Sequence, residues 1–197
     1  VFSLVFPLIL RYNFGYICYK VKLMFLISLK ATSIARKIDK YARERVFSPL
    51  TAMPVAIGIL QDDAHKISPT FISNLNKVIG IHTSSKVEVL TYIDSANKNS
   101  EETEYHFSDK DIGWNGTLKK DSLKKFSRKH FDILISYYNT DELSLKLITT
   151  ASQAYLKVGV TIDLEAYSDL TIKTALENEQ LFTTELKKYL IALKIIQ

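Results

Sequence analysis

Short apolar runs alternate with stretches of helical periodicity along most of the chain. Each run is ended by polar or turn-forming residues, and this pattern is typical of strands buried on both faces. The runs predict strands at residues 55–60, 87–93, 131–137, 155–161 and 170–174. Between them, apolar residues recur every three or four positions, as on the buried face of a helix. The clearest helix follows Ser68 and Pro69, which supply an N-cap and a first-turn proline.

Strands and helices that alternate in this way predict a parallel sheet covered on both faces. We expect a single α/β domain over residues 55–197, with a three-layer, doubly wound sheet of about five mostly parallel strands. The simplest strand order is 2-1-3-4-5, as in flavodoxin-like and Rossmann-like folds. The sequence contains no internal repeat.

A basic amphipathic helix is predicted before this domain, at residues 29–46, within a helix-and-linker segment spanning residues 24–54. Ile34, Ile38 and Tyr41 share one face of the helix. Its bases are candidate contacts to a protein partner or to an anionic surface such as a membrane or RNA: Arg36, Lys37, Lys40, Arg43 and Arg45. The alternative interpretation is that the helix docks on the domain and its basic face is only solvated.

The first 23 residues are apolar and aromatic, but Arg11 interrupts the apolar run after ten residues. A spanning helix needs about 20 apolar residues. No basic segment precedes the run, and no clear cleavage site follows it. Three interpretations stay open: a non-native upstream extension before a start at Met24, a weak hydrophobic anchor or signal segment, and an additional packed element. We expect a cytoplasmic protein, with membrane association through this segment as the alternative.

Composition and charge restrict the classes of partner. The chain of 197 residues is 47% hydrophobic and 24% charged, which is the balance of a globular domain with a core. Its net charge of +5 is concentrated at the start, because residues 1–50 carry nine Lys and Arg against two acids, and the rest carries 17 against 19. A body so close to neutral lacks the basic face that phosphate backbones require, so we expect no nucleic-acid binding by the main domain.

Metal and disulfide chemistry have little support in the sequence. Cys18 is the only cysteine, which excludes an intrachain disulfide and a cysteine-based zinc site. The four histidines show no spacing typical of a metal site. The sequence identifies no cofactor.

The predicted sheet order places a candidate crevice at the carboxyl ends of the first and third strands, where the order of strands reverses. Asp62 and Asp63 follow the first strand, and Tyr137, Tyr138 and Asn139 end the third. Because side chains alternate along a strand, we expect one tyrosine in the core and the other facing solvent or a ligand.

Trp114, the single tryptophan, is flanked by Gly113 and Gly116 in a predicted loop. It has two interpretations, a stacking surface over the crevice or an anchor that holds the loop on the core, and we favour the anchor.

The sequence lacks the motifs that are typical of phosphate binding and of nucleophilic catalysis. The chain contains neither GxGxxG nor GxxxxGK[ST] for phosphate binding, and no GxSxG for a nucleophilic serine. The acidic pair after the first strand resembles that of response-regulator receivers, but the third strand ends without the aspartate that such proteins phosphorylate. We therefore expect a non-catalytic binding or assembly module. The alternative is an enzyme or sensor that binds a nucleotide-like or sugar-phosphate molecule in the crevice.

Three segments together resemble a known family: FSDKDIGWNGTLKK at residues 107–120, FDILISYYNTDELSLKLITTASQAYLKVGV at residues 131–160, and ELKKYLIAL at residues 185–193. They are similar to uncharacterised proteins of Bacteroidota, domain of unknown function 6913, over about residues 24–196. Such proteins open with an M-F-L-x-S-x-K-like stretch, which residues 24–30 resemble, and this favours Met24 as the start. The family has no assigned activity, so the resemblance implies boundaries and no mechanism.

Overall fold

The fold is a parallel sheet between two layers of helices. The computed structural model describes residues 6–47, 54, 56–79, 86–94, 103 and 105–196, apart from the side chains of residues 6–19 and of Lys86. Over these residues the sheet has six strands in the order β3-β2-β1-β4-β5-β6, and all neighbours are parallel. The strands are β1 (Ala56–Asp62), β2 (Lys86–Tyr92), β3 (His106–Phe107), β4 (Ile133–Tyr137), β5 (Leu156–Gly159) and β6 (Leu170–Thr171).

The five predicted strands are all present, and they stand in the predicted order. The sixth strand, β3, was not predicted, because its two residues are too few to show a periodicity. It extends the sheet by pairing with the end of β2, where His106 lies opposite Thr91. The order of strands reverses between β1 and β4, as predicted, because β1 lies between β2 and β4.

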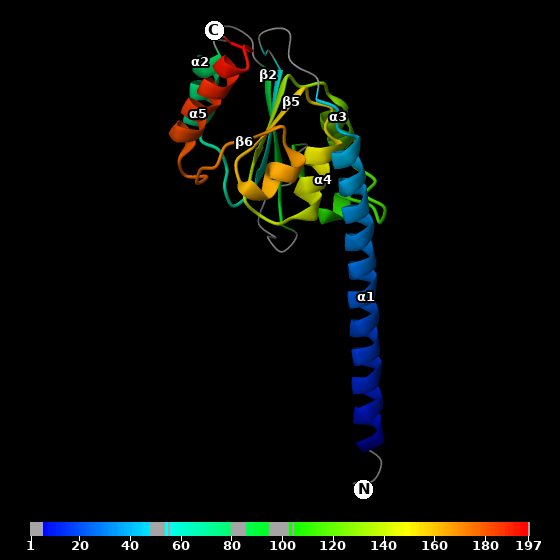
Figure 1. Cartoon of the computed structure of the whole chain (residues 1–197). Coiled ribbons are helices and arrows are strands. Elements are labelled where there is room, and N and C mark those ends of the chain that lie inside the picture. The colour runs from blue at the N-terminus through cyan, green and yellow to red at the C-terminus, as the bar shows by residue number, and fades with distance from the viewer. Residues whose placement is uncertain are drawn as a thin grey trace.

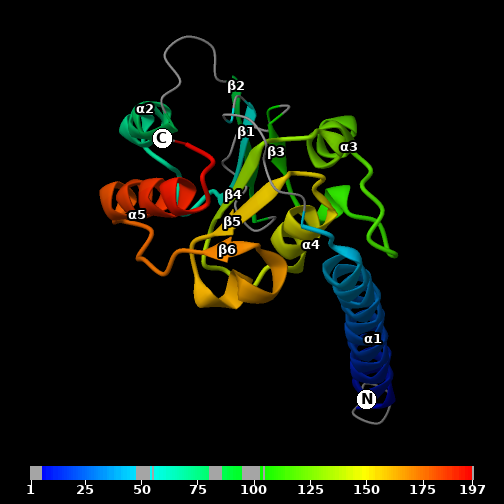
Figure 2. The ribbon, with the colours of Figure 1, turned by 45° about the horizontal axis from the view of Figure 1, so that its top comes forward.

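Helices cover both faces of the sheet (Figures 1 and 2). One layer consists of α2 (Pro69–Ile79) and α5 (Glu179–Ala192), and the other of α1 (Phe6–Glu44), α3 (Asp121–Arg128) and α4 (Leu143–Ala151). Two short 3₁₀ helices, η1 (Asp109–Asp111) and η2 (Ile162–Tyr167), lie in connections. Alternate residues of β1 enter different cores, with Ile57 and Ile59 facing α2 and α5, and Leu60 facing the other layer.

The start of α2 shows how local chemistry fixes a helix. The hydroxyl of Ser68 accepts a hydrogen bond from the Phe71 N–H at 3.0 Å, which is the predicted N-cap. The N–H of Ser68 donates to Glu179 Oε1 at 2.8 Å, and its hydroxyl donates to the same carboxylate. The first residues of α2 and α5 are therefore tied together on one face of the sheet.

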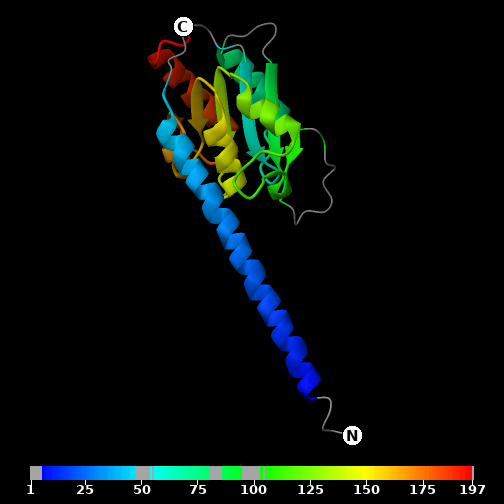
Figure 3. The same cartoon turned by 90° about the vertical axis from the view of Figure 1, so that its right-hand side faces the viewer.

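α1 is one continuous helix that reaches well beyond the domain (Figures 1 and 3). The predicted helix at residues 29–46 corresponds to the C-terminal part of α1, which ends at Glu44, and Ile34 and Ile38 are buried there as their spacing predicted. Towards its N-terminus the helix leaves the surface of the domain and projects from it. Within the described part of the chain, no helix combines the length and the apolar character that crossing a bilayer requires.

Candidate functional site

Asp62 is the last residue of β1 and Asp63 begins the turn that follows, at the carboxyl edge of the sheet where both acids were predicted. Asp62 is buried, and its Oδ1 accepts a hydrogen bond from the His65 N–H at 2.7 Å. Its second oxygen, Oδ2, is buried and makes no hydrogen bond to the described residues. Asp63 forms an ion pair with Lys66, with 2.6 Å between Oδ1 and Nζ. Each acid therefore has a neighbour within the turn, with the His65 ring 3.1 Å from Asp62 and Lys66 beside Asp63, and the buried Oδ2 of Asp62 faces neither of these groups at bonding distance.

The two tyrosines that end β4 lie in opposite cores. The hydroxyl of Tyr137 donates to the carbonyl of Leu176 at 2.6 Å, beneath α5. The hydroxyl of Tyr138 lies 2.8 Å from Thr149 Oγ1, beneath α4. Burial raises the pKa of both phenols. The prediction that one tyrosine faces solvent or a ligand is wrong, because helices cover both faces of the sheet and both hydroxyls bond within the protein.

Asn139 and Trp114 are exposed, Trp114 with 54% of its surface accessible. Trp114 is therefore not the anchor of its loop. A tight turn shapes the loop instead, since the N–H of Gly116 donates to the carbonyl of Gly113 at 3.0 Å. Gly116 has a φ of +68°, and a Cβ there would approach Cδ of Lys37 to 2.9 Å. Gly116 thus lets the loop approach α1 closely, with Trp114 left at the surface.

The five bases predicted on the N-terminal helix divide into two groups. Lys37 donates to the carbonyl of Gly116 at 2.9 Å. Arg45 forms an ion pair with Asp169 at 2.6 Å and donates to the carbonyls of residues 154 and 155 at 2.8 and 2.7 Å. These two bases hold α1 on the domain. The other three are exposed and available to a partner: Arg36, Lys40 and Arg43.

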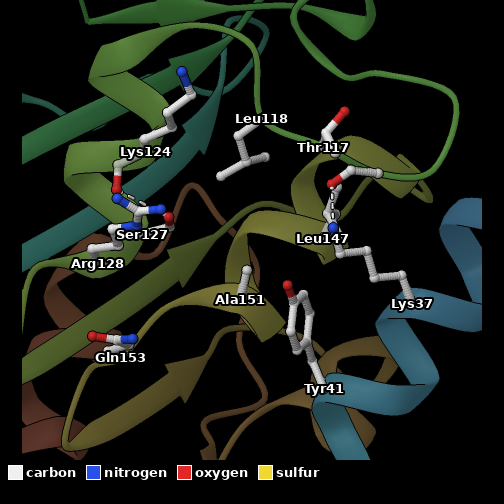
Figure 4. Close-up of a pocket in the computed structure, with 11 residues that line it drawn as sticks. Lys37, Tyr41, Thr117, Leu118, Lys124, Ser127, Arg128, Leu147, Ala151 and Gln153 are labelled. Carbon is white, nitrogen blue, oxygen red and sulfur yellow. Dashed lines mark hydrogen bonds between the residues drawn. The ribbon is translucent and has the colours of Figure 1, made fainter.

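A pocket lies between α1, α3 and α4, with a volume of about 350 Å³ (Figure 4). None of the six residues of the predicted crevice lines it. Three of the lining side chains are cationic, namely Lys37, Lys124 and Arg128. Three more carry hydroxyl groups, namely Tyr41, Thr117 and Ser127. No carboxylate is among the described residues that line this pocket.

The three cationic side chains of the pocket differ in the bonds that they form to the rest of the protein. The Lys37 ammonium is hydrogen-bonded to the Gly116 carbonyl, which leaves it two further N–H donors. The Lys124 ammonium pairs with Asp121 at 2.8 Å and points away from the other labelled side chains in Figure 4. Among the described residues, nothing forms a hydrogen bond or ion pair with the Arg128 guanidinium. Arg128 is therefore the cation best placed to accept an anionic group, because guanidinium binds carboxylate and phosphate bidentately.

A network of acids lies at the carboxyl ends of β2 and β4. The Tyr92 hydroxyl donates to Asp109 Oδ1 at 3.2 Å and lies 3.5 Å from Glu142 Oε2, and the Ser144 hydroxyl donates to Asp109 at 2.5 Å. Burial raises the pKa of Glu142, and the negative charges of Asp109 and Asp94 raise it further. The network brings together residues far apart in sequence. Across the described residues, no group of three or more His, Cys, Asp or Glu has an arrangement that could hold a metal ion.

Comparison with known proteins places the chain in a family. The sequence model of a family of unknown function (DUF6913) matches residues 30–193. The chain belongs to the DUF6913 family. The DUF6913 match begins within α1 at Lys30 and includes every residue that lines the pocket. No curated protein and no solved structure matches the chain.

Most residues of the pocket were not singled out by sequence reasoning. Lys37 was predicted as a contact residue, whereas Lys124, Ser127 and Arg128 were not among the predicted site residues. A signal was present in the two basic helices, at residues 29–46 and 121–128. The sequence could not show that these helices face each other across α4, because that depends on how α1 docks.

Proposed function

We propose that the chain is a non-catalytic binding module that takes up a small molecule bearing a phosphate or carboxylate group in the pocket between α1, α3 and α4. One observation carries this proposal, the set of cationic and hydroxyl side chains around a cavity without a carboxylate. A volume of about 350 Å³ lies within the range of pockets that hold small ligands. Charge-assisted hydrogen bonds to an anion are about twice as strong as neutral ones.

The distribution of donors indicates how an anion would be held. Arg128 on α3 presents a guanidinium, and Lys37 on α1 retains donors beside the carbonyl of Gly116. The hydroxyls of Tyr41 and Thr117 lie on the same side of the pocket as Lys37 (Figure 4). An anion would therefore bridge α1 and α3, and its binding would stabilise the docked position of α1.

The same lining supports binding without catalysis. Ser127 is the buried hydroxyl of the pocket, and it donates to the carbonyl of Lys124 at 3.2 Å within its own helix. A nucleophilic serine needs an adjacent general base. No histidine or carboxylate is among the residues that line this pocket, so nothing there would activate Ser127.

Titration calorimetry on the full chain tests this proposal, with inorganic phosphate, pyrophosphate, a nucleoside monophosphate and a sugar phosphate as probes. Arg128→Gln removes the guanidinium, and Lys125→Gln is the matched control because Lys125 lies on the same helix but outside the pocket. At least one probe should bind the unmodified chain and the control equally. We expect Arg128→Gln to weaken that binding at least about tenfold, since hydrogen bonds to charged groups contribute about 1.5–3 kcal/mol. Binding of no probe, or equal binding by both variants, would contradict the proposal.

A second candidate is the predicted enzyme or sensor that uses the crevice at the carboxyl ends of β1 and β4. The buried Oδ2 of Asp62 favours it, because a buried carboxylate oxygen without a partner could accept a hydrogen bond from a ligand. A thermal-shift screen of nucleotides and sugar phosphates separates the two sites. A shift lost in Asp62→Asn but kept in Arg128→Gln would assign binding to the crevice, and the opposite result would assign it to the pocket.

A further inference from the structure

The projecting part of α1 exposes large apolar side chains. Met24, Phe25 and Ile27 have 66%, 62% and 60% of their surfaces accessible. Val21, Leu23 and Leu29 are also exposed. They precede Lys30, which donates to the carbonyl of Asp109 at 3.0 Å, and towards its N-terminus α1 projects from the domain (Figures 1 and 3). A contiguous exposed apolar surface of this kind marks an interaction site.

These side chains lie all round the helix and not on one face. Consecutive residues of an α-helix point about 100° apart, so Leu23, Met24 and Phe25 already cover three directions. A helix that is apolar on all sides is stable when an apolar medium surrounds it. A flat contact with one protein surface would cover only one side of this segment, whereas lipids can rearrange around side chains that point in several directions.

The charge of α1 indicates which kind of partner surface its projecting part would bind. From Phe6 to Ile38 the sequence of α1 contains six bases and no acid, and the first acid is Asp39. A second copy of α1 would bring like charges together along its length. An anionic bilayer surface offers the complementary charge and also accepts apolar side chains.

We propose that residues 20–29 of α1 dock on an anionic lipid surface, with the apolar side chains in the head-group region and the exposed Lys22 among the lipid phosphates. The spacing of the bases favours a helix that lies in the interface. Only seven residues separate Lys22 from Lys30, far fewer than the roughly 20 that span a bilayer. Lysine stems can extend towards the head groups while the apolar side chains enter the interface.

Co-sedimentation of the full chain with vesicles tests this docking. The vesicles contain phosphatidylcholine alone or with about one third phosphatidylserine, at low and high salt. Lys22→Glu reverses one charge on the projecting part, and Lys173→Glu makes the same change on an exposed lysine of the domain. Each base near an anionic leaflet strengthens binding about fivefold, so Lys22→Glu should weaken it roughly 25-fold relative to Lys173→Glu. A double substitution, Phe25→Ser with Ile27→Ser, should abolish pelleting and leave the unfolding midpoint unchanged.

Each result decides the proposal. Pelleting with anionic vesicles that high salt and Lys22→Glu reduce would support it, provided the chain stays in solution without vesicles. Absence of pelleting with anionic vesicles would overturn it, and so would equal affinities of Lys22→Glu and Lys173→Glu. Light scattering that shows a dimer in the unmodified chain and a monomer in the double variant, without vesicle binding, would assign the segment to self-association instead.

Discussion

The two ends of α1 belong to one helix and have opposite surroundings. The docked end, residues 34–45, buries Ile34 and Ile38 and fixes Lys37 and Arg45 by hydrogen bonds to the domain. The projecting end, residues 20–29, leaves its apolar side chains exposed. Both ends are apolar and basic, so composition does not separate them. The arrangement of the apolar residues separates the two ends, since these residues share one face at the docked end and surround the helix at the projecting end.

The two ends of α1 also differ in what their basic side chains do. At the docked end, Arg45 and Lys37 satisfy carbonyl groups of the domain, and their role is structural. Exposed bases such as Arg36 and Lys22 have no such role, and are available to an anionic partner. Counting bases on a helix therefore does not measure its capacity to bind anions.

The largest expected difference is in the free energy of unfolding, between two variants that each truncate an apolar side chain at one end of α1. Ile38 is 2% exposed and Phe25 is 62% exposed. Ile38→Ala should lower the free energy of unfolding by about 2–5 kcal/mol, because it leaves a cavity beneath α1. Phe25→Ala should change it by less than about 0.5 kcal/mol, as expected for an exposed site. Urea denaturation of both variants measures the contrast, and similar losses of stability would show that the projecting end is packed in solution.

Sequence reasoning predicted the elements well because their signals are local. The apolar run at residues 131–137 predicted β4, and Ser68 with Pro69 predicted the start of α2. The two tyrosines at the end of β4 were misjudged, because alternation shows which faces they occupy but not that both faces are covered. The pocket could not be predicted, because it exists only where the docked end of α1 meets α3.

A smaller difference in stability is expected between variants of two neighbouring arginines at the docked end. The Arg45 guanidinium bonds to Asp169 and to two backbone carbonyls, whereas Arg43 is exposed and donates only to the carbonyl of Asp39 in its own helix. Arg45→Gln should cost about 1.5–3 kcal/mol of stability, because it removes the ion pair with Asp169 and the guanidinium bonds to two backbone carbonyls. Arg43→Gln should cost less than about 0.5 kcal/mol. Faster proteolysis at the docked end in Arg45→Gln alone would confirm that this arginine clamps α1, and equal stability of the variants would refute it.

The smallest expected effect is a pH dependence of stability that comes from the burial of Lys157, beside Arg45 of the docked end. This lysine is buried and donates to the carbonyl of Thr150 at 2.9 Å. Burial, with the nearby charge of Arg45, lowers the pKa of Lys157 to about 8, although Asp169 acts in the opposite direction. Between pH 8 and the pKa of about 10.4 in an unfolded chain, the unfolded state holds more protons, so stability should rise with pH.

The expected rise is about 1–2 kcal/mol between pH 7.5 and 9.5, measured by urea denaturation. The rise in stability should end near pH 10. Burial raises the pKa of Tyr92, Tyr137 and Tyr138 in the folded chain, so the tyrosines of the unfolded chain lose their protons at lower pH, and stability then falls. Lys157→Met should remove the rise, and Lys173→Met, at an exposed site, should keep it. Parallel pH profiles for the unmodified chain and Lys157→Met would mean that water reaches Lys157 in the folded chain, and that burial does not lower its pKa.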